Sequence, residues 1–381
     1  MSNRQRVKLS TICDIYDGTH QTPKYVDSGV KFLSVENIND IAGSNKFISE
    51  EDYNRDFKVR PERNDILMTR IGDIGTPAIV NDDSAYAYYV SLALLKCKQD
   101  RVYPQWLKQA ITTNDFQHQL WLKTLHVAFP KKINKGEIGE CLISLPPIEE
   151  QQYTAKALNK VDEVIAEREE EVKDLEKQKK GLMQKIFSQQ LRFTDSNNNP
   201  YPDWEDKKIG DVFEFYNGKA HEQEIDENGE YIVVNSKFIS TEGQVKKYTN
   251  KVICPLKKDD IVLVMSDVPN GKAMSKCYLI EEDNKYSLNQ RICCLRTKDV
   301  ARFFIYQISR NKYFLKFDNG VSQTNLRKED VLKCPIQVPC LEEQQKIANI
   351  LSKLDELIEE KKALLSDWQS FKKGLLQQMF V

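Results

Sequence analysis

The chain has 381 residues, of which 40% are hydrophobic and 30% charged, and its formal net charge is −1. This length allows two or three domains, and the composition is ordinary for a globular protein and excludes a disordered or fibrous chain. No apolar run approaches the roughly 20 residues that cross a bilayer, and the N-terminal residues hold no apolar signal core, so we expect a cytoplasmic protein.

The first 147 residues predict a globular unit with both strands and helices. Short β-branched and aromatic runs bounded by turn residues indicate strands at Lys31–Ile38, Asp65–Ile71 and Val90–Cys97. Apolar spacing from Trp106 to Lys123 predicts a helix. We therefore expect an α+β unit over residues 1–147.

A segment of about 40 residues without internal proline follows, which predicts a helix roughly 60 Å long within residues 148–192. Its apolar residues keep the alternating three- and four-residue spacing of a coiled coil: Leu158, Val161, Ile165, Val172, Leu175, Leu182 and Ile186. A single long surface helix on a core is the alternative. Four heptads exceed what such a helix needs, so we favour pairing with a second helix.

The rest of the chain repeats this layout, so a linker with a second unit is expected over residues 193–340 and a second helix over 341–381. A polar linker, Thr194–Asp206, precedes the second unit. Its runs at Tyr231–Ile239, Asp260–Ser266 and Arg291–Arg296 predict strands, and Val300–Phe317 predicts a helix. We expect four aromatic residues of this helix in the core: Phe303, Phe304, Tyr313 and Phe314. The matching segments are Val7–Gly18 with Lys207–Gly218, Arg63–Arg70 with Lys258–Met265, and Lys131–Pro146 with Thr324–Pro339.

The two long helices are the most similar parts of the repeat. The segments that start at Leu145 and Val338, 193 residues apart, are identical at roughly two positions in five without a gap. Both contain P-x-x-E-E-Q-Q near the start and K-K-G-L near the end. The second helix has the same heptad seam: Leu351, Leu354, Ile358, Leu365, Trp368, Leu375 and Met379.

Charged and apolar residues on these helices leave two questions open. The seam holds Arg168 and Lys179, matched by Lys361 and Lys372, so a symmetric antiparallel register would oppose Arg168 and Lys372. We expect either an offset register or side chains that reach water. Further apolar residues lie beside the seam, and they pack either on a partner or on this chain's own units: Val164, Met183, Leu357, Leu364 and Leu376.

No catalytic constellation is recognisable in the sequence. There is no G-x-x-x-x-G-K-[ST] phosphate loop and no G-x-G-x-x-G after a strand. The linker run Asn199–Pro202 only mimics the N/D-P-P-aromatic loop expected of an adenine methyltransferase. The nine cysteines and four histidines are dispersed without a C-x-x-C pair, so we expect neither a disulfide framework nor a metal site.

The P-x-x-E-E-Q-Q helices ending in K-K-G-L-x-Q, and the restart PYPDWEDKKIGDVF of the second unit, resemble the specificity subunits of type I restriction-modification systems. The resemblance covers nearly the whole chain. It implies two target-recognition domains that alternate with two long helices paired antiparallel as a coiled coil, an internal pseudo-two-fold repeat. It also implies a DNA-binding subunit without catalytic activity that reads a bipartite, asymmetric target.

The same resemblance implies two methylation subunits as partners, with restriction subunits joining them. The chain itself is then expected to bind no cofactor, and S-adenosylmethionine is expected on the methylation subunit. A helical spacer fixes the separation of two half-sites as a flexible linker could not. A coiled-coil adaptor that binds only proteins, and an enzyme with an unrecognised site, are the alternatives.

DNA contacts must come from Lys and Arg on phosphates and from polar side chains on base edges. From Lys285 to Lys333 there are eleven Lys or Arg against four Asp or Glu, a local excess that the net charge hides. Arg70 closes a predicted strand, Lys131 and Lys132 precede another, and Lys219 and His221 follow Gly218 at the place that matches the run after Gly18. The candidates are Thr19, His20, Gln21, Thr22, Arg70, Lys131 and Lys132 in the first unit, and Lys219, His221, Asn289, Gln290, Arg291, Ser322, Gln323, Asn325, Arg327 and Lys328 in the second.

Overall fold

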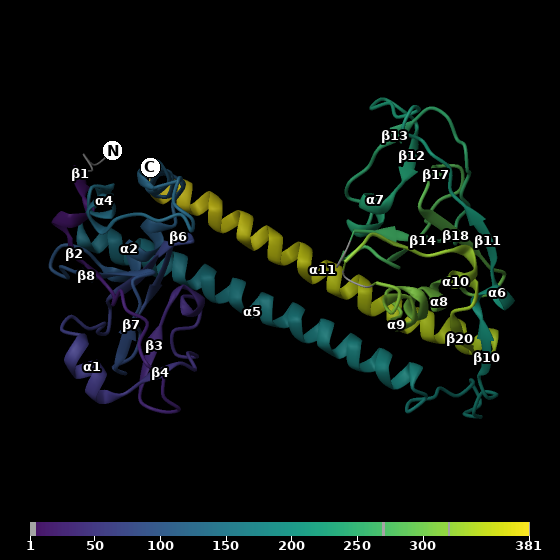
Figure 1. Cartoon of the computed structure of the whole chain (residues 1–381), viewed down its shortest axis with the longest axis horizontal. Helices are drawn as coiled ribbons and strands as arrows, with labels where there is room; N and C mark the ends of the chain where they lie inside the picture. Colours follow the sequence, from purple (N-terminus) through teal and green to yellow (C-terminus); the bar gives the residue numbers. More distant parts are fainter. Residues whose placement is uncertain (1–4, 269–270, 319–320, 381) are drawn as a thin grey trace. The chain divides into compact units, whose positions relative to one another are not determined.

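The computed structural model describes residues 5–268, 271–318 and 321–380. The chain divides into two compact units: unit 1 comprises Met1–Glu170 and Lys362–Val381, and unit 2 comprises Glu171–Lys361. Both units mix strands with helices, so both are α+β as predicted (Figure 1). None of the described helices is long and apolar enough to cross a membrane.

Unit 1 is built around a four-stranded antiparallel sheet with two apolar central strands. Ile66 and Met68 pack with the buried residues of the neighbouring helices, whereas Leu67 points to the other face and packs with residues of a smaller sheet. The four strands in spatial order are β2 (Cys13–Asp17), β8 (Leu92–Cys97), β5 (Ile66–Ile71) and β6 (Asp73–Ile79). The other strands are β4 (Phe47–Ile48), β3 (Val30–Leu33) and β7 (Tyr86–Tyr88) in the smaller sheet, and β1 (Gln5–Lys8) paired with β9 (Leu142–Leu145).

Two elements of unit 1 are shorter than the sequence predicted, because polar side chains end them. The strand expected to Ile38 ends at Leu33, where Ser34 and Asn37 cap a short 3-10 turn. The helix expected from Trp106 to Lys123 is two helices, because the Thr113 side chain accepts a hydrogen bond from Phe116 N and starts a new one. The helices are α1 (Glu50–Asp56), α2 (Pro104–Ile111), α3 (Asn114–Lys123) and α4 (Lys135–Gly139).

Unit 2 repeats the sheet order of unit 1. Its four-stranded sheet has the order β11 (Glu214–Asn217), β18 (Ile292–Arg296), β14 (Ile261–Val264) and β16 (Cys277–Leu279). The smaller sheet has β13 (Tyr248–Thr249), β12 (Tyr231–Val234) and β17 (Tyr286–Leu288). Two pairs complete the strands: β10 (Glu205–Lys208) with β20 (Pro335–Val338), and β15 (Ser266–Asp267) with β19 (Thr324–Asn325).

Asparagine caps shorten two predicted elements of unit 2. The strand expected to Ile239 ends at Val234, where Asn235 caps a helix, and the helix expected over Val300–Phe317 breaks where Asn311 caps a second one. The aromatic residues Phe303, Phe304 and Phe314 are buried, as predicted, and Tyr313 is half-buried against the same core. The helices are α6 (Ile209–Val212), α7 (Ser236–Ser240), α8 (Ala301–Ile308), α9 (Lys312–Leu315) and α10 (Lys328–Leu332).

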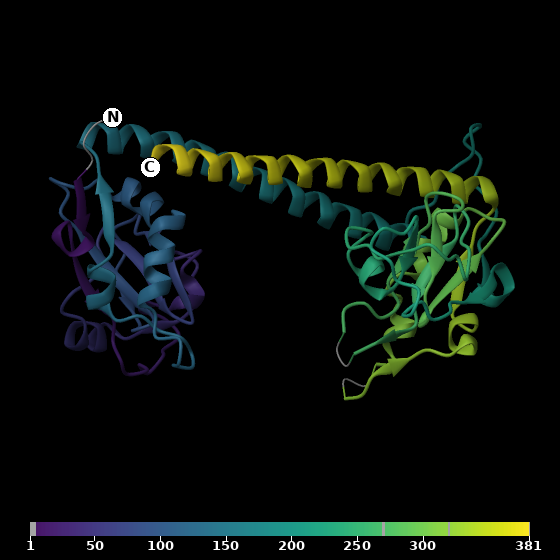
Figure 2. The same cartoon turned by 90° about the horizontal axis from the view of Figure 1, so that it is seen from above.

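The two long helices, α5 (Ile148–Phe187) and α11 (Leu341–Met379), are uninterrupted (Figures 1 and 2). Each starts with the same buried clamp. The Gln151 side chain donates to Pro146 O and accepts from Tyr103 N, both at 2.8 Å. Gln344 donates to Pro339 O at 2.9 Å and accepts from Val300 N at 3.1 Å. The first glutamine of the repeated motif therefore fastens each helix to the strands and helices that precede it in the chain.

Polar contacts between the helices within each unit show that they run antiparallel. In unit 1, Lys372 contacts Asp162 at 2.6 Å, and Gln369 contacts Glu169 at 3.3 Å. Residue numbers rise along one helix as their partners' numbers fall along the other. The register is therefore offset from the one that would oppose Arg168 and Lys372, and the seam lysine meets a carboxylate.

Unit 2 contains the counterpart of this pair. Lys179 pairs with Asp355, and Lys361 contacts Glu171 at 2.7 Å. The repeat relates Lys179 to Lys372 and Asp162 to Asp355, so the pairs Asp162–Lys372 and Lys179–Asp355 are equivalent. The antiparallel coiled coil with an internal pseudo-two-fold repeat is confirmed.

The ends of the long helices complete the cores. The ring of Phe380, just after α11, stacks on Trp106 in unit 1 with centroids 5.4 Å apart. Phe187, at the end of α5, lies against Phe303 in unit 2 at 5.8 Å. The repeat relates Phe187 to Phe380. Each helix therefore starts on one globular part and ends on the other.

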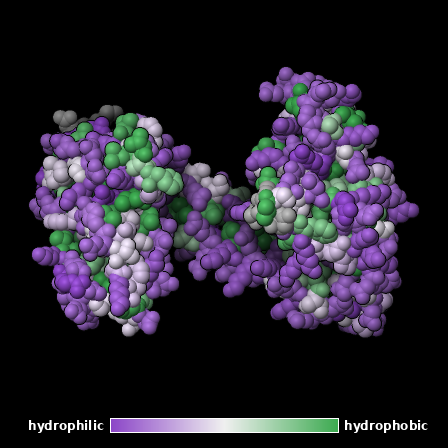
Figure 3. Space-filling view, in the orientation of Figure 1, coloured by the Kyte–Doolittle hydropathy of each residue, from purple (hydrophilic) through white to green (hydrophobic). Residues whose placement is uncertain are grey.

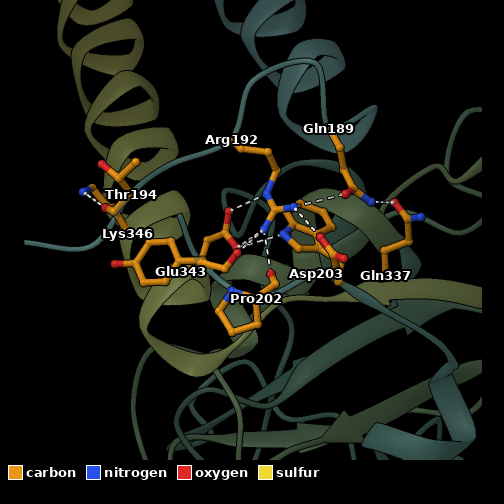
Figure 4. Close-up of polar contacts among 10 residues, drawn as sticks. Gln189, Arg192, Thr194, Pro202, Asp203, Gln337, Glu343 and Lys346 are labelled. Carbon is orange, nitrogen blue, oxygen red and sulfur yellow. Dashed lines mark hydrogen bonds and ion pairs between the residues drawn. The ribbon is translucent and has the colours of Figure 1, made fainter. Parts of the chain in front are cut away.

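The polar linker is anchored more firmly than its composition suggested. Arg192 forms an ion pair with Glu343, which is fully buried and also accepts a hydrogen bond from Trp204 Nε1 at 2.9 Å (Figure 4). Arg192 also donates to Pro202 O at 2.7 Å. The start of α11 thus holds both ends of the linker.

Candidate nucleic-acid interface

In unit 1, loops from distant parts of the sequence meet where β2 ends and β5 turns into β6. Thr19 N donates to Tyr88 O at 3.1 Å, and Gly72 N donates to Lys131 O at 2.8 Å. We call this the loop end of unit 1; it consists of residues 17–22, 70–73, 89–91 and 131–133.

Unit 2 has the corresponding loop end. Lys219 N donates to Leu288 O at 3.2 Å, and Met265 N donates to Arg291 O at 2.9 Å. β15 and β19 pair here through Asp267 and Thr324. The loop end of unit 2 consists of residues 217–222, 265–267, 289–291 and 322–326.

The two loop ends have the same backbone frame. Ile71 bridges Lys132 in unit 1, and at the matching place Ser266 pairs with Asn325 in unit 2. Backbone contacts of this kind do not depend on which side chains are present. The side chains that the frame presents can therefore differ between the units while the frame stays the same.

Most of the predicted DNA-binding residues lie at these loop ends with accessible side chains. Lys131 and Lys132 are exposed in unit 1, and Lys219 and Arg291 are exposed in unit 2. The other accessible candidates are His20, Gln21, Thr22, Gln290, Ser322, Gln323, Asn325, Arg327 and Lys328, which are exposed, and Thr19 and Asn289, which are half-buried.

Two predicted residues are buried, and the prediction of direct DNA contact is corrected for them. Arg70 is 5% exposed; its guanidinium pairs with Asp17 and donates to Ile133 O at 3.0 Å. His221 is fully buried and bonds Ser287 Oγ at 2.7 Å. Arg70 lies near the end of β5 and His221 in a loop, and the side chains of both point inward and hold the neighbouring loops in place.

Several accessible candidates already have partners inside the chain. Gln290 donates to Glu222 at 2.5 Å. Backbone N–H groups and this amide keep the pKa of the Glu222 carboxyl below its usual value, so it is ionised at neutral pH. Gln323 donates to Ser266 Oγ at 2.7 Å. These contacts orient the amides rather than bury them.

Arg327 and Lys328 lie farther along, where α10 begins. Arg327 forms an ion pair with Asp330 at 3.2 Å, and the Lys328 ammonium lies 5.4 Å from the centre of the Phe215 ring. Both side chains remain exposed. They can reach phosphates only by leaving or sharing these contacts.

Sequence reasoning missed an apolar element beside the loop end of unit 1. Val127 and Phe129 are 99% and 104% exposed, and they directly precede Lys131 and Lys132. The signal was the run HVAFPKK after a predicted helix, where apolar residues lack helical spacing.

The loop ends offer hydrogen-bond donors, acceptors and cations, which suits phosphates and base edges. No group of three or more His, Cys, Asp or Glu side chains that could hold a metal ion occurs within the described residues. In the face shown in Figure 3, hydrophilic residues cover most of both units, and hydrophobic residues form small groups.

The partner residues proposed beside the helical seam are divided between inner and outer positions. Met183 packs against the buried core of unit 2. Leu376 lines a cavity of about 290 Å³ in unit 1. Leu364 is 38% exposed, and Val164 and Leu357 are half-buried. The apolar stripe therefore serves partly to pack on the chain's own units.

Two solved structures share this fold over their whole length. The type I restriction-modification S subunit from M. genitalium matches with a TM-score of 0.62 and 16% identity, covering 100% of this chain and 97% of that one. A chain from a structure on complex assembly and conformational transition of the type I R-M system matches with a TM-score of 0.54 and 15% identity, covering 99% and 97%.

Sequence relatives agree with the fold. The type I restriction enzyme MjaVIII specificity subunit of Methanocaldococcus jannaschii is 29% identical over 267 residues, 64% of this chain and 62% of the relative. The MjaIX specificity subunit of the same organism is 27% identical over 198 residues, 46% and 44% of the two chains. The chain thus spans less than two thirds of these relatives' lengths.

The family of the type I restriction modification DNA specificity domain matches residues 1–177 and again residues 201–366. The two matches coincide with the two halves of the repeat. The chain therefore belongs to the type I restriction-modification DNA specificity family.

Proposed function

We propose that this chain reads an interrupted, asymmetric DNA target, one half-site with the loop end of each unit. The observation that carries the proposal is the repeated frame with different side chains. Unit 1 presents Lys131 and Lys132, whereas the matching positions of unit 2 hold the buried Thr324 and the exposed Asn325. A frame that is the same in both units sets the same approach to DNA, and different side chains read different bases.

The chain acts in this proposal without chemistry of its own. Two methylation subunits bind it, carry S-adenosylmethionine and methylate adenine, and restriction subunits join this complex. The long helices join the two recognition units, and a bipartite reader needs two such units for half-sites near one helical turn apart. The complex works in the cytoplasm, where its DNA is.

A purely protein-binding adaptor is less well supported. An adaptor would need the helices, but it would give no reason for two copies of a loop end rich in amides and cations. The half-buried and inward-packed members of the apolar stripe also leave less free surface for such a role.

The decisive experiment is a map of methylated adenines in cells that carry the chain with its methylation subunit. A bipartite asymmetric motif that disappears when this chain is deleted supports the proposal. A continuous short motif, or one unchanged by the deletion, rules it out.

Binding of the purified complex to that motif should also depend steeply on salt. Lysine and arginine contacts release counterions, so affinity should fall by orders of magnitude between about 50 and 200 mM salt. Binding that does not respond to salt would contradict phosphate contacts at the loop ends.

A further inference from the structure

A narrow loop projects beside the loop end of unit 1. Its base is fixed from two sides: Leu125 N donates to Lys132 O at 2.8 Å, and Gly72 N donates to Lys131 O at 2.8 Å. Ile71, at the end of β5, bridges Lys132 as well. Residues 126–130 form the tip of this loop, which is anchored directly to the sheet.

The tip presents apolar side chains to water. Val127 is 99% exposed and Phe129 is 104% exposed, and Trp121, just before the loop, is 58% exposed. Apolar groups gathered on a surface mark places where something else binds. An anchored tip can present such a group at a defined position, as a loose segment cannot.

The charge around the tip identifies the partner as DNA. Lys131 and Lys132 follow Phe129 after one proline, and both are exposed. Protein interfaces are depleted in lysine, whereas DNA-binding loops combine lysine on phosphates with apolar side chains against bases. The tip is also continuous with the loop end through the contact between Gly72 and Lys131.

The matching segment of unit 2 is anchored to its neighbouring strand in the same way but carries different side chains. Ser266 pairs with Asn325, as Ile71 does with Lys132. Ser322 and Gln323 stand in place of Phe129 and Pro130, so the aromatic ring is absent, although Val321 is 84% exposed. The two loops are anchored in the same way, so the side chains that differ between them are those that can tell two half-sites apart.

We propose that Phe129 contacts the bases of the half-site read by unit 1, while Lys131 and Lys132 bind the flanking phosphates. The inference rests on the proposed function. A phenyl ring has no hydrogen bond to offer, so it selects bases by apolar contact: with a thymine methyl group in the major groove or with a base step that opens easily.

The test uses the full-length chain with its methylation subunits and a duplex carrying the motif found by methylation mapping. Phe129→Ala should weaken specific binding by about tenfold or more, with binding to an unrelated duplex unchanged. Lys132→Ala should weaken binding to both duplexes by the same factor. It should also reduce by about one the slope of the logarithm of affinity against the logarithm of salt concentration. Tyr153→Ala removes another exposed aromatic of unit 1, on α5, and should change neither.

Substituted duplexes then locate the contact. Replacement of thymine by uracil in the first half-site removes the methyl group, and 2-aminopurine reports an opened step by its fluorescence. The wild-type complex should respond at one position of that half-site, and the Phe129→Ala complex should not. A response in the second half-site would mean that the tip does not contact the half-site read by unit 1, and this would overturn the inference.

The outcomes separate the inference from the proposed function. A wild-type complex that binds no bipartite site contradicts the proposed function itself. If the wild type binds such a site and Phe129→Ala binds it equally well, the inference alone is wrong. If Phe129→Ala instead prevents assembly with the methylation subunit, the tip is a protein-docking element, and the inference is again overturned.

Discussion

Single polar residues decide how each long helix is attached to its unit. Gln344 is buried and satisfied on both sides of its amide, whereas Gln345 beside it is exposed. Gln344→Ala leaves Val300 N and Pro339 O without this partner, so unfolding free energy should fall by about 1–3 kcal/mol. Gln345→Ala is the matched control and should change it by less than about 0.5 kcal/mol. Urea unfolding measures the effect of both substitutions. Equal effects would contradict the role of the Gln344 hydrogen bonds in attaching α11.

Arg291 is the residue best placed to test the division of labour. It is exposed, and its backbone oxygen fixes Met265 at the loop end of unit 2. Arg291→Ala should relax recognition at one half-site, by about 1–3 kcal/mol at the contacted base, and leave the other half-site unchanged. Methylation of a library of variant sites measures this. An equal loss at both half-sites would make Arg291 a general phosphate or structural contact.

Ion pairs link the two long helices along their length. Lys372 lies about a quarter exposed against Asp162, which Gln109 also holds at 2.6 Å. Lys372→Glu would place two carboxylates together, and because the site is partly solvated we expect a loss of about 1 kcal/mol of stability. The neighbouring exposed Lys373 provides the control, Lys373→Glu. Thermal unfolding that responds equally to both changes would contradict the pairing seen here.

The long helix α11 also carries the more accessible residues of the apolar stripe beside the seam. Leu364 is 38% exposed and Leu357 half-buried, so a docked helix can cover them. Leu357→Asp with Leu364→Asp should weaken binding of the methylation subunit at least tenfold, since a charge would be buried unpaired. Ala363→Asp alters an exposed neighbour and should not. Circular dichroism of the isolated chain shows whether the double variant is folded. Loss of helical signal would mean that these leucines pack inside the chain.

The equivalence of the two halves is a property of the whole molecule. A fragment of residues 1–188 keeps one globular part and α5, with Asp162, Lys179 and Phe187 on it. Two such fragments paired antiparallel would form the pair Asp162–Lys179 twice, and Phe187 of one copy would take the place of Phe380 against Trp106 of the other. We therefore predict a two-fold homodimer.

Sedimentation should show this dimer forming with increasing fragment concentration. With methylation subunits it should direct methylation to a palindromic interrupted site. Lys179→Glu should weaken the dimer, because it removes both ion pairs at once. A fragment that is folded but strictly monomeric at tens of micromolar would show that the halves are not interchangeable.

The sequence alone determined the repeat, the two long helices and the α+β character of both units. These features follow from local periodicity, because heptads and short apolar runs fix which residues must be covered. Local caps were harder to predict: Thr113, Asn235 and Asn311 interrupt elements whose apolar spacing continues through them. Side-chain hydrogen bonds of single residues decided those boundaries.

Only the tertiary structure decided which loop residues face outward. His221 and Lys219 lie two positions apart with similar composition around them, yet one is buried on Ser287 and the other exposed. Likewise, Lys372 meets Asp162 because packing offsets the helices, not because the heptad pattern requires it. Burial and register depend on contacts between residues far apart in the chain, and a local pattern does not contain them.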